Sequence, residues 1–140
     1  MKTNSRLVFN LVRTGILSVL VLVLALPREA LAHAKLQRST PSDKGDLTVA
    51  PKQIELWFSE LLDDKFNSIE VFPSAEAGNK THAALTDGDV KVDPKDRTHL
   101  TVNLKTLPPG DYTVDWRVLS RDGHSAPGRF TFKVLTAAGE

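Results

Sequence analysis

His33 stands where processing of the chain could create a metal-binding N-terminus. It follows Ala30-Leu31-Ala32, which fits the small-x-small rule for signal-peptide cleavage, so cleavage after Ala32 would make His33 the first residue. A free α-amine has a pKa of about 7.7–8.0 and an imidazole one of about 6.5, so both groups lose their protons readily near neutral pH. Together they can chelate one metal ion, and Cu(II) prefers such tetragonal nitrogen and oxygen donors. The alternative is that His33 only marks the end of the signal.

Asp122-Gly123-His124 is the second candidate for metal binding. It lies in a polar bend between two alternating runs near the C-terminus. Residues two apart in an extended chain point the same way, so the carboxylate and the imidazole can face one ligand position, and Gly123 permits a sharp turn. The alternative is an ordinary Asp-Gly turn followed by an exposed histidine. The two candidates support each other, because an N-terminal strand and this bend can meet in a β-sandwich.

The composition limits the available chemistry to nitrogen and oxygen donors. The chain has no cysteine, and Met1 is its one methionine, so a thiolate site, a disulfide framework and a cysteine nucleophile are excluded. With 25% charged residues and a formal net charge of +1, the chain lacks the basic stripe that nucleic-acid binding needs. No Gly-x-Ser-x-Gly elbow supports hydrolase chemistry.

Residues 1–32 are predicted to be a cleaved secretory signal peptide. Three basic residues precede a 12-residue apolar run from Gly15 to Leu26 that only Ser18 interrupts. That run is shorter than the roughly 20 residues that a membrane-spanning helix needs. Cleavage removes four of the 18 basic and one of the 17 acidic residues, which leaves residues 33–140 with a net charge of −2 and no methionine. We expect residues 33–140 to form one domain.

Beyond the signal, apolar and polar residues alternate with the period of two that is typical of β-strands. The clear runs are residues 54–58, 69–72, 100–104, 112–118 and 130–134. Weaker runs at 34–38 and 90–92 bring the number of predicted strands to about seven, separated by turns such as the one at 40–45. Helical periodicity is nearly absent, and only residues 59–66 could make a helical turn.

Short alternating strands of this number predict an all-β fold, a seven-stranded antiparallel Greek-key β-sandwich of immunoglobulin-like type. Tyr112 begins the longest strand directly after a Pro-Pro-Gly-Asp turn, where such sandwiches often carry a tyrosine corner. Tyr112 could equally be an ordinary core aromatic, and both interpretations fit this fold. We expect His82 and His99, which lie near the starts of strands or in loops, to be surface histidines.

Residues 33–140 resemble the CopC family of periplasmic copper-binding proteins. The stretches that carry the resemblance are His33–Leu36 with Ser39–Pro41, Pro51 with Leu56–Glu60, and Leu107–Val114 continuing through Ser120–His124 to Gly128–Phe132. The last stretch is the most specific, because it combines a strand, the Asp-Gly-His bend and the following strand in one run.

The resemblance implies a β-sandwich with cupredoxin-like connectivity that binds one Cu(II) through the amine and imidazole of His33, the carboxylate of Asp122 and the imidazole of His124. Some family members carry a Met-rich loop for Cu(I), but residues 33–140 contain no Met or Cys, so we expect a Cu(II)-only member. The family acts in copper resistance or uptake in the periplasm, often associated with, or fused to, a membrane protein of the CopD type. We expect any such partner here to be a separate chain. The protein is expected not to be an enzyme.

Two other classes of protein stay open at this stage. An N-terminal histidine plus a second histidine also makes the copper brace of oxidative polysaccharide-cleaving enzymes, although Asp122 would then fill a position that oxygen needs. The other class is a metal-free immunoglobulin-like interaction module. That alternative predicts no copper affinity beyond that of a protein with a blocked His33.

Overall fold

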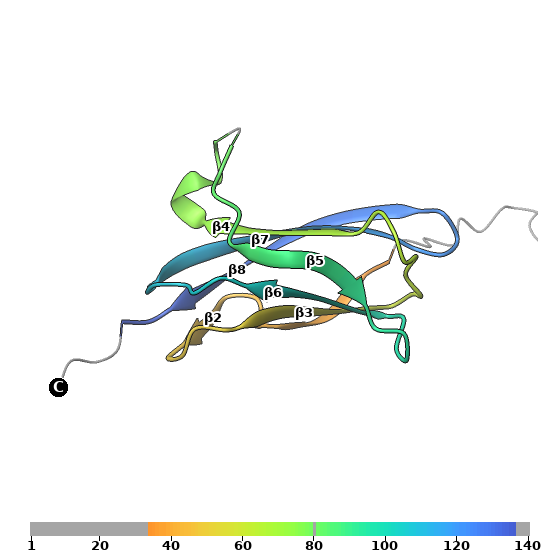
Figure 1. Cartoon of the computed structure of the whole chain (residues 1–140), viewed down its shortest axis with the longest axis horizontal. Helices are drawn as coiled ribbons and strands as arrows, with labels where there is room; N and C mark the ends of the chain where they lie inside the picture. Colours follow the sequence, from red (N-terminus) through yellow and green to blue (C-terminus); the bar gives the residue numbers. More distant parts are fainter. Residues whose placement is uncertain (1–33, 80, 137–140) are drawn as a thin grey trace, which may run out of the picture. The chain divides into compact units, whose positions relative to one another are not determined.

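The alternating runs fold into two four-stranded sheets that make a β-sandwich (Figure 1). This computed structural model describes residues 34–79 and 81–136. The strands are β1 (Leu36–Thr40), β2 (Gly45–Leu47), β3 (Gln53–Phe58), β4 (Ser68–Pro73), β5 (Thr86–Val92), β6 (His99–Leu104), β7 (Gly110–Leu119) and β8 (Ser125–Val134). A short 3-10 turn, η1 (Ser74–Glu76), follows β4.

One sheet has the strand order β1-β3-β6-β5 and the other has the order β2-β8-β7-β4. The connections from β3 to β4, from β4 to β5 and from β6 to β7 each pass from one sheet to the other. All strand pairs are antiparallel except β2 with β8, which is parallel. The predicted all-β sandwich is therefore confirmed, with eight strands in the described residues in place of seven and with one parallel pair.

The additional strand is β2, which the sequence pattern did not reveal. It has only three residues, too few to show an alternation of apolar and polar side chains. Its position is set by β8, because Gly45 pairs with Phe132 and Leu47 pairs with Val134. The backbone N–H of Leu135 also donates to the carbonyl of Leu47, at 2.8 Å. Long-range pairing and not local propensity defines this strand.

Residues 59–66, the one segment that could have made a helical turn, do not form one. This segment has no helical hydrogen bonds; Leu62 instead forms an isolated antiparallel bridge with Ser120. The N–H groups of Ser59, Leu62 and Asp63 bond to carbonyls far away in the sequence, where a helix would pair them locally. Within residues 34–79 and 81–136 we find no helix with the length and apolar character needed to cross a membrane.

The inner faces of both sheets form one core. The alternating residues of β7 are buried, and Trp116 packs edge-on against Phe58 of the opposite sheet with ring centroids 5.0 Å apart. Tyr112 is 3% exposed and its hydroxyl donates to the carbonyl of Pro108 at 2.6 Å, four residues upstream. Tyr112 is thus both a core aromatic and a tyrosine corner, so the two interpretations of this residue hold together.

Gly128 is required by the packing of Trp116. The two residues are paired across β7 and β8, and a Cβ atom at Gly128 would lie 2.1 Å from Cζ2 of the indole. We expect Gly128→Ala to displace the indole and to lower the free energy of unfolding by about 1–3 kcal/mol. Urea denaturation monitored by tryptophan fluorescence measures this loss.

Gly78→Ala is the matched control, because nothing lies within 4 Å of a Cβ atom built there. Its free energy of unfolding should stay close to that of the wild type. Equal stability of Gly128→Ala and Gly78→Ala would show that the indole is not held against Gly128.

Candidate metal site

The turn between β7 and β8 carries two of the three predicted ligand residues. It follows the last pair of the hairpin, Leu119 with Ser125. The N–H of Ser120 donates to the carbonyl of His124 at 2.9 Å, and the N–H of Gly123 donates to the carbonyl of Ser120 at 2.9 Å. Gly123 has a φ of +92°, a backbone conformation that favours glycine. The Asp-Gly sequence therefore fixes the reversal that brings residues 122 and 124 together.

Asp122 and His124 form a hydrogen-bonded pair. Oδ2 of Asp122 lies 3.0 Å from Nδ1 of His124, and Oδ1 accepts the backbone N–H of His124 at 3.1 Å. Oδ1 also accepts a short hydrogen bond from the Ser120 hydroxyl. The hydrogen bonds from the Ser120 hydroxyl, the His124 backbone and the His124 ring lower the pKa of Asp122 from 3.8 to about 2. Asp122 is thus a carboxylate throughout the neutral pH range.

This pair has a defined consequence for metal binding. A carboxylate beside Nδ1 stabilises the tautomer in which Nδ1 carries the proton and Nε2 carries the lone pair. Histidines that bind metals usually donate their other ring N–H to a carboxylate or carbonyl in this way. Because the carboxylate lies on the Nδ1 side of the ring, Asp122 supports His124 in this arrangement. Asp122 would reach an ion bound at Nε2 only after its carboxylate or the ring rotates.

His33 lies outside the described residues, but its chain neighbours are tied to the same end of the sandwich. Ala34 is 3% exposed. The N–H of Lys35 donates to Oγ of Ser59, and the N–H of Ser59 donates to the carbonyl of Lys35, both at 2.9 Å. In Figure 1 the first described residues, in orange, and the β7–β8 turn, in blue, lie toward the same end.

Residues 59–63 connect the start of β1 with the β7–β8 turn. The segment begins at Ser59, the hydrogen-bond partner of Lys35. The N–H of Arg121 donates to the carbonyl of Leu61 at 2.9 Å. Further along, the N–H of Asp63 donates to the carbonyl of Leu119 at 2.8 Å. The two regions that carry the predicted ligands are therefore attached to one short segment.

Within residues 34–79 and 81–136, no group of three or more His, Cys, Asp or Glu side chains is arranged to hold a metal ion. The described part of the predicted site is the pair of Asp122 and His124. Side-chain exposure is 41% for Asp122 and 60% for His124, so both can be reached from solvent.

His99 is not the surface histidine that we expected. Its side chain is 15% exposed and stacks on Trp57 with ring centroids 4.2 Å apart and an interplanar angle of 3°. The guanidinium of Arg38 covers the indole, 3.6 Å from the ring centroid. Nε2 of His99 lies 3.1 Å from Oε2 of Glu55, and Nδ1 lies 3.7 Å from Oδ2 of Asp93. The two carboxylates flank opposite ring nitrogens, so they do not converge on one metal position.

His82 also departs from the expectation of a surface position. Its side chain is 20% exposed and its ring lies against that of Phe72, with centroids 3.9 Å apart. Nε2 of His82 lies 3.5 Å from Oε2 of Glu70. Both departures have the same cause, because an aromatic ring from a neighbouring strand lies against each imidazole: Trp57 of β3 for His99 and Phe72 of β4 for His82.

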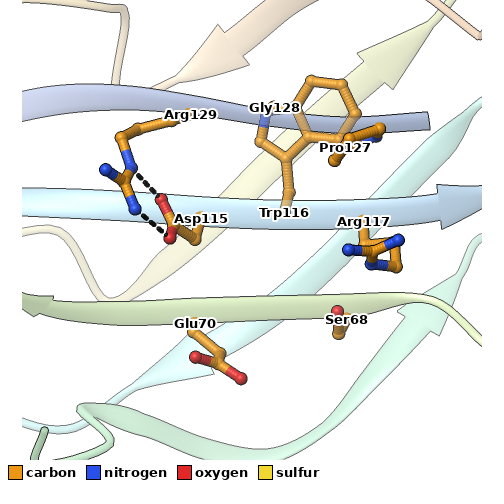
Figure 2. Close-up of a pocket in the computed structure, with 8 residues that line it drawn as sticks. All are labelled: Ser68, Glu70, Asp115, Trp116, Arg117, Pro127, Gly128 and Arg129. Atoms are coloured by element: carbon orange, nitrogen blue, oxygen red, sulfur yellow. Dashed lines mark hydrogen bonds and ion pairs between the residues drawn. The ribbon is translucent and has the colours of Figure 1, made fainter. Parts of the chain in front are cut away.

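A shallow hollow of about 490 Å³ lies on the second sheet (Figure 2). Its lining residues come from β4, β7 and β8 and are Ser68, Glu70, Asp115, Trp116, Arg117, Pro127, Gly128 and Arg129. Nη2 of Arg129 donates to Oδ2 of Asp115 at 2.5 Å, and Nε donates to Oδ1, so these two charges neutralise each other. None of the lining residues belongs to the β7–β8 turn, and we assign the hollow no role in metal binding.

The eight-stranded β-sandwich is the fold on which comparison with known proteins can be based. The sequence matches the CopC domain over residues 36–135, and the chain therefore belongs to the CopC family. It is 35% identical over 127 residues to copper resistance protein C of Pseudomonas syringae pv. tomato, which covers 87% of this chain and 96% of that protein. Among solved structures, CopC from Methylosinus trichosporium OB3b matches with a TM-score of 0.67 and 28% identity, covering 77% of this chain and 99% of that one.

A further relative is much longer than this chain. Copper transport protein CutJ of Bacillus subtilis (strain 168) is 32% identical over 123 residues, which are 86% of this chain but only 21% of CutJ. The relatives are thus named for copper resistance and copper transport, and the fold is that of the solved CopC structure.

The low pKa of Asp122 gives a testable pH dependence. A carboxyl group whose pKa is lower in the folded than in the unfolded protein stabilises the fold at pH values above its unfolded pKa of about 3.9. That stabilisation is lost as the pH falls through about 2. We expect the difference in unfolding free energy between the wild type and Asp122→Asn to shrink between pH 4 and 2.

Chemical denaturation of the metal-free proteins at each pH measures this difference. Carboxyl carbon chemical shifts give the titration midpoint of Asp122 directly. A midpoint near 3.9, with a stability difference that does not change with pH, would contradict the hydrogen bonds described for this carboxylate.

Proposed function

We propose that residues 33–140 form a periplasmic protein that binds one Cu(II) and acts in copper resistance or delivery. In this proposal, cleavage after Ala32 exposes the amine of His33, and the ion is bound by that amine, the imidazoles of His33 and His124, and Asp122. The observation that carries the proposal is the Asp122–His124 pair, held on a turn at the end of the sandwich where β1 begins.

The donor set suits the proposed cargo. Two imidazoles, an amine and a carboxylate offer three nitrogen atoms and one oxygen atom, as four-coordinate Cu(II) prefers. The hydrogen bond between Oδ2 of Asp122 and Nδ1 of His124 favours binding through Nε2. In that state Asp122 supports His124, and after rotation of its carboxylate it can complete the coordination.

The backbone near the start of β1 supports the participation of His33. Ala34, the first described residue, is 3% exposed and therefore held against the core. Lys35 is bonded to Ser59, at the beginning of the segment that also holds the β7–β8 turn. These links favour a site that His33 and His124 share.

The lack of sulfur in residues 33–140 supports the proposed oxidation state of the cargo. Residues 33–140 contain neither Met nor Cys, and soft sulfur ligands are those that select Cu(I). We propose a Cu(II) carrier that releases the ion on reduction. The names of the relatives, for copper resistance and copper transport, fit this role, and a separate membrane protein of the CopD type is the proposed partner.

The first test is a Cu(II) titration of protein that begins at His33 and of the same protein with one additional residue before His33. We expect the native N-terminus to bind one Cu(II) with a nitrogen-rich tetragonal electron paramagnetic resonance signal. The additional residue converts the α-amine of His33 into a peptide N–H. The Cu(II) affinity of the extended protein should therefore fall by more than the roughly 10–100-fold that the loss of an outer-sphere partner costs. Equal affinity of the two forms would refute the N-terminal site and favour a metal-free interaction module.

The second test compares two histidine substitutions. His124→Ala removes a proposed ligand, and we expect Cu(II) affinity to fall by more than the roughly 10–100-fold that the loss of an outer-sphere partner costs. His82→Ala is the control, because its ring lies against Phe72 and outside the β7–β8 turn. Competition with a chelator of known affinity measures both. An equal loss in the two variants would show that binding is not specific to the proposed site.

A further inference from the structure

Ser120 is an unusual residue at the base of the β7–β8 turn. It is 1% exposed, and Ser120 and Thr113 are the two buried polar or charged residues in the described part of the chain. A buried hydroxyl without a hydrogen-bond partner is destabilising, so its partners identify its role. For Thr113 the partner is Oγ of Ser74, at 2.8 Å, in η1. For Ser120 the partners all lie in the turn itself.

The Ser120 hydroxyl holds the two proposed ligand residues. It donates a short hydrogen bond to Oδ1 of Asp122 and lies 3.0 Å from the carbonyl oxygen of His124. The other carboxylate oxygen, Oδ2, then contacts Nδ1 of the His124 ring at 3.0 Å. A connected path of hydrogen bonds therefore runs from Ser120 through Asp122 to the imidazole.

The backbone at Ser120 is held within the turn by two hydrogen bonds and is also attached to the buried segment around Leu62. Ser120 forms an isolated antiparallel β-bridge with Leu62, which is 0% exposed. The N–H of Leu62 donates to the carbonyl of Arg97 at 2.8 Å, and Nη2 of Arg97 donates to the carbonyl of Leu62 at 3.0 Å. Nη2 of Arg97 also lies 2.8 Å from Oδ1 of Asp64. Ser120 is thus a rigid point from which an exposed carboxylate and an exposed imidazole can be oriented.

We propose that Ser120 is a positioning residue for copper binding: its buried hydroxyl orients the Asp122 carboxylate, which in turn orients the His124 imidazole and sets its tautomer. This inference rests on the proposed function of the turn. Partners that orient metal-binding histidines contribute about 10–100-fold to metal affinity, and we expect Ser120 to act within that range.

The test begins with Ser120→Ala and the matched control Thr113→Val, each of which removes one buried hydroxyl. We expect Ser120→Ala to lower Cu(II) affinity by about 10–100-fold and to give a heterogeneous electron paramagnetic resonance signal. Thr113→Val should keep the affinity and the signal of the wild type, because its hydroxyl bonds to Ser74 and not to the turn. Equal effects of the two substitutions would overturn the proposal.

A double-mutant cycle separates positioning from a general effect on folding. If Ser120 acts through Asp122, then Ser120→Ala should cause little further loss of Cu(II) affinity in the Asp122→Ala background. A full additional loss in that background would overturn the proposed path. Ser120→Thr retains the hydroxyl and is expected to restore most of the affinity.

A measurement without copper distinguishes this inference from the proposed function. Nitrogen chemical shifts of the metal-free protein report which ring nitrogen of His124 carries the proton. We expect predominantly the Nδ1-protonated form in the wild type and a mixture of tautomers in Ser120→Ala. A wild-type protein with this tautomer but no Cu(II) affinity would refute the proposed function, whereas tight copper binding that Ser120→Ala leaves unchanged would refute the role of Ser120.

Discussion

The attachment of residues 59–63 to the end of β7 is the interaction on which the candidate site depends. Leu62 and Ser120 are both fully buried and bridge each other between segments that lie far apart in the sequence. The same short segment bonds to Lys35 at the start of β1 and to Arg97 before β6. Because buried backbone groups must find hydrogen-bond partners, these links fix how the start of β1, the loop and the hairpin turn approach one another.

In the β7–β8 turn, hydrogen bonds restrict the orientations of the Asp122 carboxylate and the His124 imidazole. Oδ1 and Oδ2 of Asp122 are both engaged, and Gly123 supplies the backbone conformation that closes the turn. A site whose side chains are already oriented loses less conformational entropy when a ligand binds. The carboxylate stays ionised across neutral pH, so it also favours a cation at the adjacent imidazole.

A histidine with carboxylate neighbours can also have a structural role, as His99 shows. The ring of His99 stacks on Trp57 and is flanked by Glu55 and Asp93. Its side chain is 15% exposed, whereas that of His124 is 60% exposed. Its carboxylate partners lie at opposite ring nitrogens, which ties strands together but leaves no common ligand position. In His124 an exposed imidazole lies on a turn beside a carboxylate that is itself hydrogen-bonded to a buried hydroxyl, which is a different arrangement.

The sequence alone determined the fold class and the chemistry of the donors. The period of two along β7 predicts a buried face, Asp122 and His124 are close because they are two residues apart, and the lack of sulfur beyond Met1 follows from composition. Tertiary structure decided the rest. β2 exists only through β8, the segment after Ser59 is not helical because its partners are distant, and Ser120 is a positioning candidate only because the core buries its hydroxyl. A local sequence pattern shows only how apolar and polar side chains alternate along one segment. Contacts between residues far apart in the chain depend instead on how the two sheets pack.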